Sequence, residues 1–295
     1  MFEKVLFSTD FSEYAESALN CIGGFPGARD VILLHVIEGA RSPRGGGEIG
    51  DVLFRTGKNF LKEEKRHLEN LSQNLRVTTA VKVSSDIAGA ILETAEEKGA
   101  NLIVVGARGK SLVEGILLGS VSMAVLRRAR TSVLIMRHKI VEDLSGKSYE
   151  MFCPMILSRV LCPVDFSRYS DNAMDLIKTM KGVGEVILLH VVSRGESEGE
   201  IEEAVRAAKS QMEVIKSSLA DQGISARTIV QTGNPAFEIT KIADTEDASV
   251  IWMSSHGKGW FRDLLLGSTA YTVAMNAKRP VIIIRTPEGK GNGKG

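Results

Sequence analysis

The stretch VVGARGKSLVEGILLGSV, residues 104–121, predicts a strand that leads through a glycine-containing loop into a helix. The apolar run stops at Gly106, a second glycine follows at Gly109, and nine further residues precede Gly119-Ser120, where a helical pattern begins. The first turn of a helix carries unpaired N–H groups and a partial positive charge, so such a junction can hold a phosphate. From this copy alone, turn glycines at a strand exit are an equally good interpretation.

The same spacing occurs a second time near the end of the printed sequence. Ser254 stands where the first copy has Gly106, and nine residues separate Gly257 from Gly267-Ser268. Two copies of an unusual spacing argue against turn chemistry alone. We therefore expect two units, each of which presents one such loop.

The repeat extends well beyond the loops. VLFSTDFS at 5–12 matches VLCPVDFS at 160–167, and VILLHV occurs at 31–36 and at 186–191, with the same offset (160 − 5 = 186 − 31 = 155). At the glycine loops the offset is 267 − 119 = 148, so the second unit lacks seven residues between its second and fourth strands. A period this long indicates duplicated domains and excludes a solenoid.

Strands and helices alternate within each unit. VILLHV is apolar throughout, which is typical of a strand covered on both faces of a parallel sheet. Right-handed crossovers then place helices on both faces. The sequence thus predicts an α/β fold of two tandem Rossmann-like domains, each a five-stranded parallel sheet. In the first unit the strands are expected over 5–9, 31–36, 77–83, 101–105 and 132–136.

The length of 295 residues suits two domains of about 150 residues each. We assign unit one to residues 1–140, a linker without clear periodicity to 141–158, unit two to 159–287 and a disordered tail to 288–295. These boundaries follow the repeat and the loss of pattern between its copies.

Composition excludes several classes of function. The net charge of +1 gives no support for affinity to nucleic acid or membranes, and no apolar run is long enough to cross a bilayer. The first ten residues fit no signal peptide, so we expect a cytoplasmic protein. Cys21, Cys153 and Cys162 form no CxxC pair, and we interpret them as buried or neutral thiols.

Three predicted strands of unit one end at residues that can form a binding site. Asp10 follows the first strand, Val36 ends the second and Gly106 ends the fourth. Ligands of open parallel sheets bind beyond the carboxyl ends of the strands, where neighbouring strands lead to opposite faces. We therefore expect these residues to meet in one crevice.

The glycine loop differs from the common nucleotide motifs. Residues 109–111 read GKS like the end of a Walker A loop, but that motif needs glycine at position 104, which is valine, and no GxGxxG follows the first strand. The remaining pattern, G-x2-G-x9-G-S, resembles the ATP-binding signature of the universal stress protein family. Other features are similar to the same family: the first strands end in aspartate, as STD at 8–10 and PVD at 163–165, and the LLHV strands and LLLGS at 264–268 also match. The resemblance therefore covers nearly the whole chain.

The resemblance implies a role for each matching residue. Asp10 and Val36 would contact the adenosine, Val36 through its backbone, and the glycines would line the ribose and phosphates. Arg108 could offset phosphate charge. In unit one the implied site is Ser8, Thr9, Asp10, Val36, Gly106, Arg108, Gly109, Gly119, Ser120 and Val121. In unit two it is Pro163, Val164, Asp165, Val191, Ser254, Gly257, Gly267, Ser268 and Thr269.

Simpler interpretations stay open for several of these residues. Asp10 could cap the next helix, Val36 could belong only to the core, and Ser120 could be an N-cap, a role that is compatible with phosphate binding. We interpret His35 and His190, which lie inside apolar strands, as core residues.

Unit two departs from the family pattern in its loop. Ser254 replaces the first glycine and adds a Cβ atom where the backbone has to approach the nucleotide, and Trp260 is also bulky. We expect unit one to bind nucleotide more tightly than unit two.

The resemblance implies a stress-response protein that holds ATP or AMP as a binding and regulatory module. No catalytic residue and no metal ligand is assigned, so ATP hydrolysis should be slow at most, and Mg²⁺ would come with the phosphates. One alternative is an adenylate-forming or nucleotidyl-transfer enzyme of related fold, but no HxGH motif follows the first strand. Another is a nucleotide-free interaction scaffold, against which the intact loop of unit one argues.

Family members commonly dimerise through their fifth strands, here 132–136 and 281–284. In a tandem chain we expect the two units to form that pair internally and so cover two sheet edges, with a further homodimer possible. No nucleic-acid or membrane partner is expected, and the sequence names no protein partner.

Overall fold

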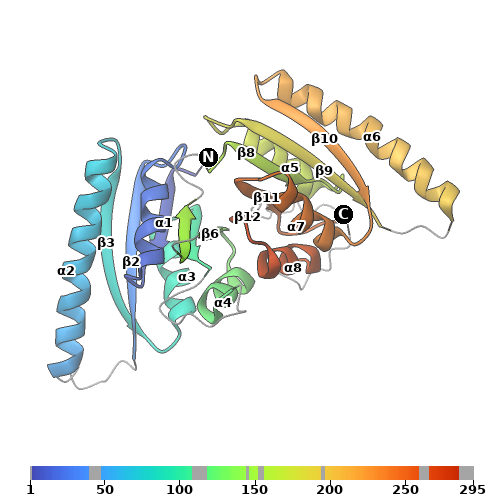
Figure 1. Cartoon of the computed structure of the whole chain (residues 1–295). Helices are drawn as coiled ribbons and strands as arrows, with labels where there is room; N and C mark the ends of the chain where they lie inside the picture. Colours follow the sequence, from blue (N-terminus) through green and yellow to red (C-terminus); the bar gives the residue numbers. More distant parts are fainter. Residues whose placement is uncertain are drawn as a thin grey trace, which may run out of the picture.

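Ten strands of the described residues form one continuous sheet, and two others form a separate hairpin (Figure 1). The computed structural model describes residues 2–39, 48–107, 118–143, 146–151, 156–193, 197–258 and 266–285. Unit one comprises β1 (Lys4–Ser8), α1 (Glu13–Gly23), β2 (Asp30–Glu38), α2 (Glu48–Leu71), β3 (Arg76–Ser84), α3 (Ile87–Lys98), β4 (Leu102–Gly106), α4 (Ser120–Arg128) and β5 (Ser132–Met136). Unit two comprises β8 (Arg159–Pro163), α5 (Arg168–Lys178), β9 (Glu185–Val192), α6 (Glu198–Ala220), β10 (Ser225–Thr232), α7 (Pro235–Thr245), β11 (Val250–Ser254), α8 (Ser268–Asn276) and β12 (Val281–Ile284). The predicted α/β fold is confirmed.

The five strands of each unit are parallel, and the first strand lies in the middle of its set. The order is β3-β2-β1-β4-β5 in unit one and β12-β11-β8-β9-β10 in unit two. β1 pairs with β2 on one side and with β4 on the other, so the connections that lead to these two neighbours run to opposite sides of β1. This arrangement creates the switch point at which ligands bind in such sheets. β5 and β12 pair antiparallel, with Val133 opposite Ile283, so the strands of the two units run in opposite senses.

Apolar side chains fill both faces of the sheet. Leu6 and Phe7 are consecutive residues of β1, are at most 1% exposed and belong to different apolar clusters, because successive strand residues point to opposite faces. The cluster that contains Phe7 includes residues of α1, α2, α5 and α6, and the other includes residues of α3, α4, α7 and α8. Each apolar cluster therefore contains residues of both units.

Five helices begin where a side chain satisfies an N–H group of their first turn. Each cap is a residue with a short polar side chain, whose oxygen accepts a hydrogen bond from the N–H three positions on. These caps of α1, α3, α5, α6 and α7 are Ser12, Asp86, Ser167, Ser197 and Asn234. Local sequence therefore determines where these helices start.

Two arginines make reciprocal contacts across the junction of the units. Nη2 of Arg137, after β5, donates to the carbonyl of Ala274 in α8, and Nη2 of Arg285, after β12, donates to the carbonyl of Leu126 in α4 at 2.8 Å. Burial lowers the pKa of Arg285 to about 10. Each glycine-loop helix thus has its C-terminal carbonyls bound by the other unit.

The segment predicted as a linker contains regular structure. β6 (His138–Asp143) and β7 (Gly146–Met151) pair antiparallel and form the separate hairpin. The hairpin lacks the alternation of apolar and polar residues that a half-buried strand shows, which explains why the sequence pattern did not predict it. The predicted tail, 288–295, lies outside the described residues.

The interpretation of Cys21 as a thiol is wrong. Cys21 is buried in α1 and is disulfide-bonded. Cys162 in β8 is a free thiol, as expected, and burial raises its pKa. Spacing alone gave no indication of the bond, because the partners of a disulfide need not be close in sequence.

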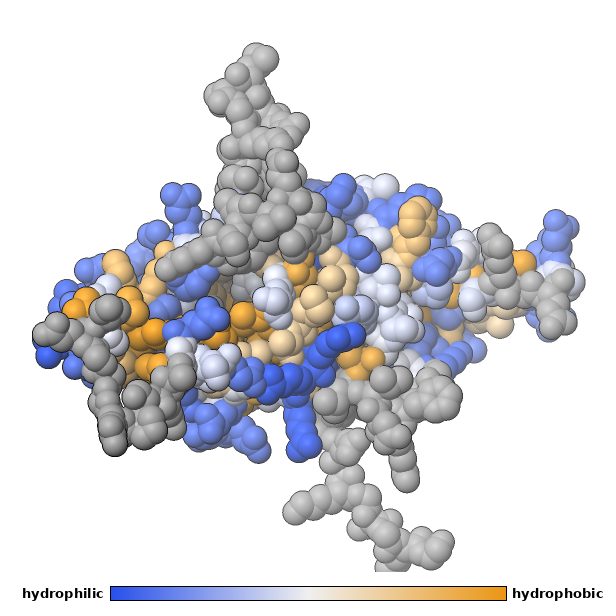
Figure 2. Space-filling model, turned by 90° about the horizontal axis from the view of Figure 1, so that it is seen from below, coloured by the Kyte–Doolittle hydropathy of each residue, from blue (hydrophilic) through white to orange (hydrophobic). Residues whose placement is uncertain are grey.

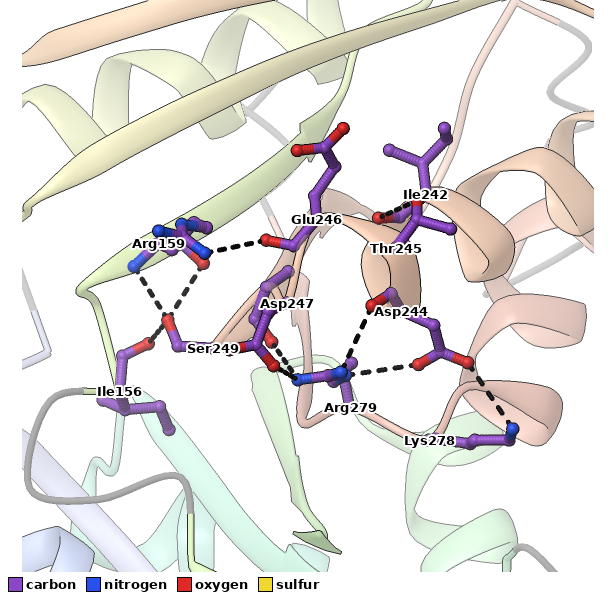
Figure 3. A network of polar contacts seen from close by, with 11 residues as sticks. Ile156, Arg159, Ile242, Asp244, Thr245, Glu246, Asp247, Ser249, Lys278 and Arg279 are labelled. Atoms are coloured by element: carbon purple, nitrogen blue, oxygen red, sulfur yellow. Dashed lines mark hydrogen bonds and ion pairs between the residues drawn. The ribbon is translucent and has the colours of Figure 1, made fainter.

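A polar network fixes the end of unit two that lies away from the carboxyl ends of its strands (Figure 3). Arg279, which precedes β12 and is 9% exposed, donates to Oδ1 of Asp247 at 2.7 Å, Oδ1 of Asp244 at 3.2 Å and the carbonyl of Ala248 at 3.2 Å. It therefore ties the C-terminus of α7 to β12. Nearby, the hydroxyl of Ser249 donates to the carbonyl of Ile156 at 2.8 Å.

We predict that Arg279→Met destabilises the protein by about 1–3 kcal/mol, because it keeps the side-chain length but removes the buried guanidinium group and leaves the buried carbonyl of Ala248 without that donor. Urea unfolding followed by circular dichroism measures this change. Arg76→Met, which removes an ion pair of a 77% exposed arginine with Asp30, is the matched control and should leave the midpoint unchanged. Equal midpoints for the two variants would contradict the importance of the network.

Candidate functional site

A cleft of about 790 Å³ lies at the carboxyl ends of β1, β2 and β4. We call it cleft one. All the described residues predicted for the site of unit one line it, which are Ser8, Thr9, Asp10, Val36, Gly106, Gly119, Ser120 and Val121. Arg108 and Gly109 lie outside the described residues. The topology thus brings together residues that are up to 113 positions apart (121 − 8 = 113).

A second cleft of about 580 Å³, cleft two, occupies the equivalent place in unit two. It is lined by all the residues predicted there, which are Pro163, Val164, Asp165, Val191, Ser254, Gly257, Gly267, Ser268 and Thr269. The same strand-end geometry therefore occurs in both copies of the repeat.

The helices that open into the clefts start differently from the five capped helices. α4 and α8 have glycine at the N-cap, Gly119 and Gly267, so the cap residue has no side chain that could bond to the first turn. The N–H of Gly119 donates to the carbonyl of Ala107 and that of Gly267 donates to the carbonyl of Ser255, both at 2.8 Å, which closes each loop at its base. A helix start with unpaired first-turn N–H groups beside strand ends is a type of site that can bind an anion.

Asp10 stabilises the turn after β1 but does not cap α1. Its Oδ1 accepts hydrogen bonds from the backbone N–H of Ser12 at 3.1 Å and from the Ser12 hydroxyl at 2.6 Å, and Ser12 is itself the helix cap. Phe11, between them, has a φ of 59°, and Phe166 in unit two has 58°. A left-handed conformation is unusual for a bulky residue, so both copies maintain the same strained turn.

In unit two, the position of Asp165 accounts for the glycine at position 257 of the loop. Oδ1 of Asp165 accepts from the N–H of Ser167 at 3.0 Å, and Oδ2 accepts from the N–H of Lys258 at 2.9 Å. A Cβ atom on Gly257 would collide with Oδ2 of Asp165. The glycine is needed because the carboxylate approaches the loop backbone at that position.

The two loops are held by different hydroxyl groups. In unit one, Ser122 of α4 donates to the carbonyl of Gly106 at 2.6 Å. In unit two the position of Ser122 is Ala270 (270 − 122 = 148), and Ser254 instead donates to the carbonyl of His256 at 2.6 Å. The extra side chain at 254 is therefore bound to its own loop.

His35 and His190 support the turns that carry the aspartates. Nδ1 of His35 contacts the carbonyl oxygen of Thr9 at 2.9 Å, and Nδ1 of His190 contacts that of Val164 at 2.7 Å. Each ring also packs on the turn phenylalanine, with centroids 4.3 and 4.5 Å apart. Burial lowers the pKa of His190. A neutral ring with a proton on Nδ1 fits this donor role.

Sequence reasoning missed Glu64 of α2. The hydroxyl of Thr9 donates to its Oε1 at 2.8 Å, whereas Oε2 is buried and has no hydrogen-bond partner among the described residues. Burial raises the pKa of Glu64 to about 7, against the opposing effect of the Thr9 hydrogen bond. A carboxylate on the buried stripe between Leu61 and Leu68 is the signal that could have identified it.

The first half of α2 forms an apolar wall of cleft one. Leu53 and Phe60 line the cleft while 49% and 46% exposed. Figure 2 views the molecule from the side on which β2 ends and α2 begins, and shows apolar surface at the end where α2 lies. When the buried residues Leu61 and Met212 are aligned (212 − 61 = 151), Leu53 corresponds to Ala204, which lines cleft two. The wall is therefore specific to unit one.

The described part of the chain contains neither a metal-binding cluster nor a membrane-spanning helix. No three His, Cys, Asp or Glu residues there lie close enough together to hold a metal ion. No helix there has the length and apolar character needed to span a membrane.

Comparison with known proteins gives the same family for both units. The family model described as universal stress protein family matches residues 1–137 and 157–285. A universal stress protein of Methanocaldococcus jannaschii is 32% identical over 156 residues, which cover 44% of this chain and 96% of that protein.

Solved structures of family members are also similar. The crystal structure of a universal stress protein from Archaeoglobus fulgidus is similar to this chain with a TM-score of 0.69 and 24% identity, over 96% of both chains. At this identity the similarity shows a shared fold. A universal stress protein solved in complex with cAMP is 26% identical over 45% of this chain and 95% of its own, with a TM-score of 0.35. Because the family model matches both units in full, this chain belongs to the universal stress protein family, as a tandem member.

Proposed function

We propose that this chain binds an adenine nucleotide, ATP or AMP, in cleft one and acts as a regulatory module in the stress response. The observation that carries the proposal is the uncapped start of α4, which opens into a cleft that Asp10 and Val36 also line. A helix start of this kind attracts phosphate, and the other two residues lie where adenosine would extend from it.

In this proposal one group of residues contacts the phosphates of the nucleotide and another contacts its adenosine. Gly119, Ser120 and Val121 bind phosphates through backbone N–H groups, with the hydroxyl of Ser120 as a further donor. Asp10 accepts from the ribose, and the backbone of Val36 reads the adenine edge. Mg²⁺ comes with the phosphates, as no cluster of ligands in the described ranges would hold it alone.

The cleft residues favour binding over catalysis. The described residues at the start of α4 that line cleft one are Gly119, Ser120, Val121 and Ser122, none of which is a base at neutral pH. His35 also lines the cleft, but its Nδ1 contacts the carbonyl of Thr9. Phosphoryl transfer needs a group that orients or activates the attacking water, so hydrolysis should be slow.

We propose that the two units act as an intramolecular pseudo-dimer. The antiparallel pairing of β5 with β12 covers one edge of each five-stranded set, so neither edge is left as a template for another chain. This arrangement supplies two clefts that differ in their lining.

We also propose that unit two binds nucleotide more weakly than unit one. Ser254 adds a side chain at the position that Gly106 occupies in unit one, and this side chain bonds to the loop backbone. Cleft two is also smaller than cleft one.

The first prediction concerns nucleotide content. The purified full-length protein, denatured and analysed by mass spectrometry, should release ATP or AMP, and the emptied protein should bind either one in calorimetry. The readout identifies the ligand directly. Absence of nucleotide together with absence of binding would refute the proposed function.

The second prediction concerns the asymmetry of the loops. Photolabelling of the full chain with 8-azido-ATP should label peptides of unit one more than those of unit two. Ser254→Gly should strengthen labelling of unit two, and Gly106→Ser should weaken that of unit one, each by about fivefold to tenfold, which corresponds to about 1 kcal/mol.

Ser225→Gly, at the exposed amino end of β10 and away from the strand ends that form cleft two, is the matched control and should leave the labelling pattern unchanged. Equal labelling of the two units in the wild type would contradict the asymmetry.

The third prediction concerns turnover. With ATP and Mg²⁺ the protein should release ADP far more slowly than the about 10 s⁻¹ that is typical of enzymes. A coupled assay measures the rate. Sustained release at an enzymatic rate, whether of ADP or of pyrophosphate, would replace the binding-module proposal with an enzymatic one.

A further inference from the structure

Glu64 is a buried carboxyl group directly behind cleft one. It lies on the stripe of α2 that packs on the sheet, between Leu61 and Leu68, which are 1% and 0% exposed. Its Oε1 accepts from the hydroxyl of Thr9, and its Oε2 is enclosed without a hydrogen-bond partner in the part of the chain that the structure describes. An enclosed and unsatisfied carboxyl oxygen is costly, so the position is unfavourable for stability alone.

Thr9 connects this carboxyl group to the site. Its hydroxyl, which donates to Glu64, also accepts from the N–H of Phe11 at 3.1 Å. Its N–H donates to the carbonyl of Leu34 at 2.9 Å, and its own carbonyl contacts Nδ1 of His35. Thr9 is 3% exposed and immediately precedes Asp10. The hydrogen bond that Thr9 donates to Glu64 therefore connects this carboxyl group to the turn that carries Asp10.

The second unit is an internal control for the role of this pair. Thr9 corresponds to Val164 (164 − 9 = 155), and Glu64 corresponds to Ile215 (215 − 64 = 151), so an apolar pair replaces the polar one. Val164 and Ile215 belong to the same apolar cluster. The turn nevertheless has the same left-handed geometry in both units. The fold does not need the hydroxyl or the carboxyl group, which directs attention to the ligand.

The charged groups around Glu64 are mainly acidic. Asp10 approaches from the turn after β1 and Glu16 from α1, and both negative charges raise the pKa of Glu64 beyond the effect of burial. His35 of β2 contacts the carbonyl of Thr9 on the same side. Within the described residues no lysine or arginine forms an ion pair with Glu64. Ionisation of Glu64 thus adds a third negative charge behind the cleft.

We propose that Glu64 is a positioning residue of the site in unit one and links nucleotide binding to proton uptake. The inference rests on the proposed function. Neutral Glu64 allows the turn to hold Asp10 beside an anionic ligand, whereas ionised Glu64 repels that ligand. A bound anion favours the protonated carboxyl group, so binding near neutral pH takes up a proton and affinity falls as pH rises through the titration of Glu64.

Calorimetric titration of the full-length protein with ATP at about pH 6 and about pH 8 tests the inference. The ratio of ATP affinity at the lower pH to ATP affinity at the higher pH should be roughly threefold to tenfold larger for the wild type than for Glu64→Gln. Comparing the two proteins cancels the titration of the ligand itself. Glu63→Gln, which removes the same charge from an exposed neighbour on α2, should retain the wild-type ratio. Buffers of different ionisation enthalpy at pH near 7 should reveal proton uptake by the wild type beyond that of Glu64→Gln.

The double variant Thr9→Val/Glu64→Ile, which reproduces the apolar pair of unit two, should have the same pH dependence as Glu64→Gln. It also provides the measurement if Glu64→Gln does not fold, as judged by circular dichroism. Binding with the same pH ratio and proton uptake in the wild type and both Glu64 variants would overturn the proton linkage and leave the proposed function intact. If the wild type binds no ATP at both pH values, the proton linkage and the proposed function are both overturned.

Discussion

The hydrogen bond from the N–H of Gly119 to the carbonyl of Ala107 is the constraint on which the site of unit one depends. It closes the loop between β4 and α4 at its base, so that the start of α4 lies beside the end of β4. Because the residue at the N-cap is glycine, the cap has no side chain that could bond to the N–H groups of the first turn. A strand end and an uncapped helix start are thus held together at the switch point of the sheet, where β1 and β2 contribute Asp10 and Val36.

Duplication lets the chain use this geometry twice with different linings. The antiparallel junction joins the two sheets, and Arg137 and Arg285 each bind the C-terminal carbonyls of the other unit's loop helix. Both loops close in the same way, and both turns share one strained conformation. The differences lie behind and beside the clefts, where unit one has Glu64 and Leu53 and unit two has apolar or smaller residues. The scaffold is therefore symmetric, whereas the chemistry of its clefts is not.

Much of this was predictable because it depends on local pattern. Apolar strands, polar helix caps and the repeated loop spacing determine the order of the elements, and topology then brings Asp10 and Val36 to one cleft. Features that depend on tertiary contact were not predictable. Glu64 carries the signal of a charge on a buried stripe, but its partner is 55 residues away. The hairpin β6-β7 has no alternating pattern, and the disulfide of Cys21 involves no sequence motif.

The central claim is that the first turn of α4 binds the phosphates of a nucleotide through its backbone. Amide chemical shifts of the full-length protein, recorded by nuclear magnetic resonance with ATP and with adenosine, test this most directly. We expect ATP to shift the amide signals of Ser120, Val121 and Ser122, whereas adenosine should leave these signals in place and shift those near Asp10 and Val36. Unchanged signals of 120–122 at saturating ATP, or equal shifts with adenosine, would contradict this claim.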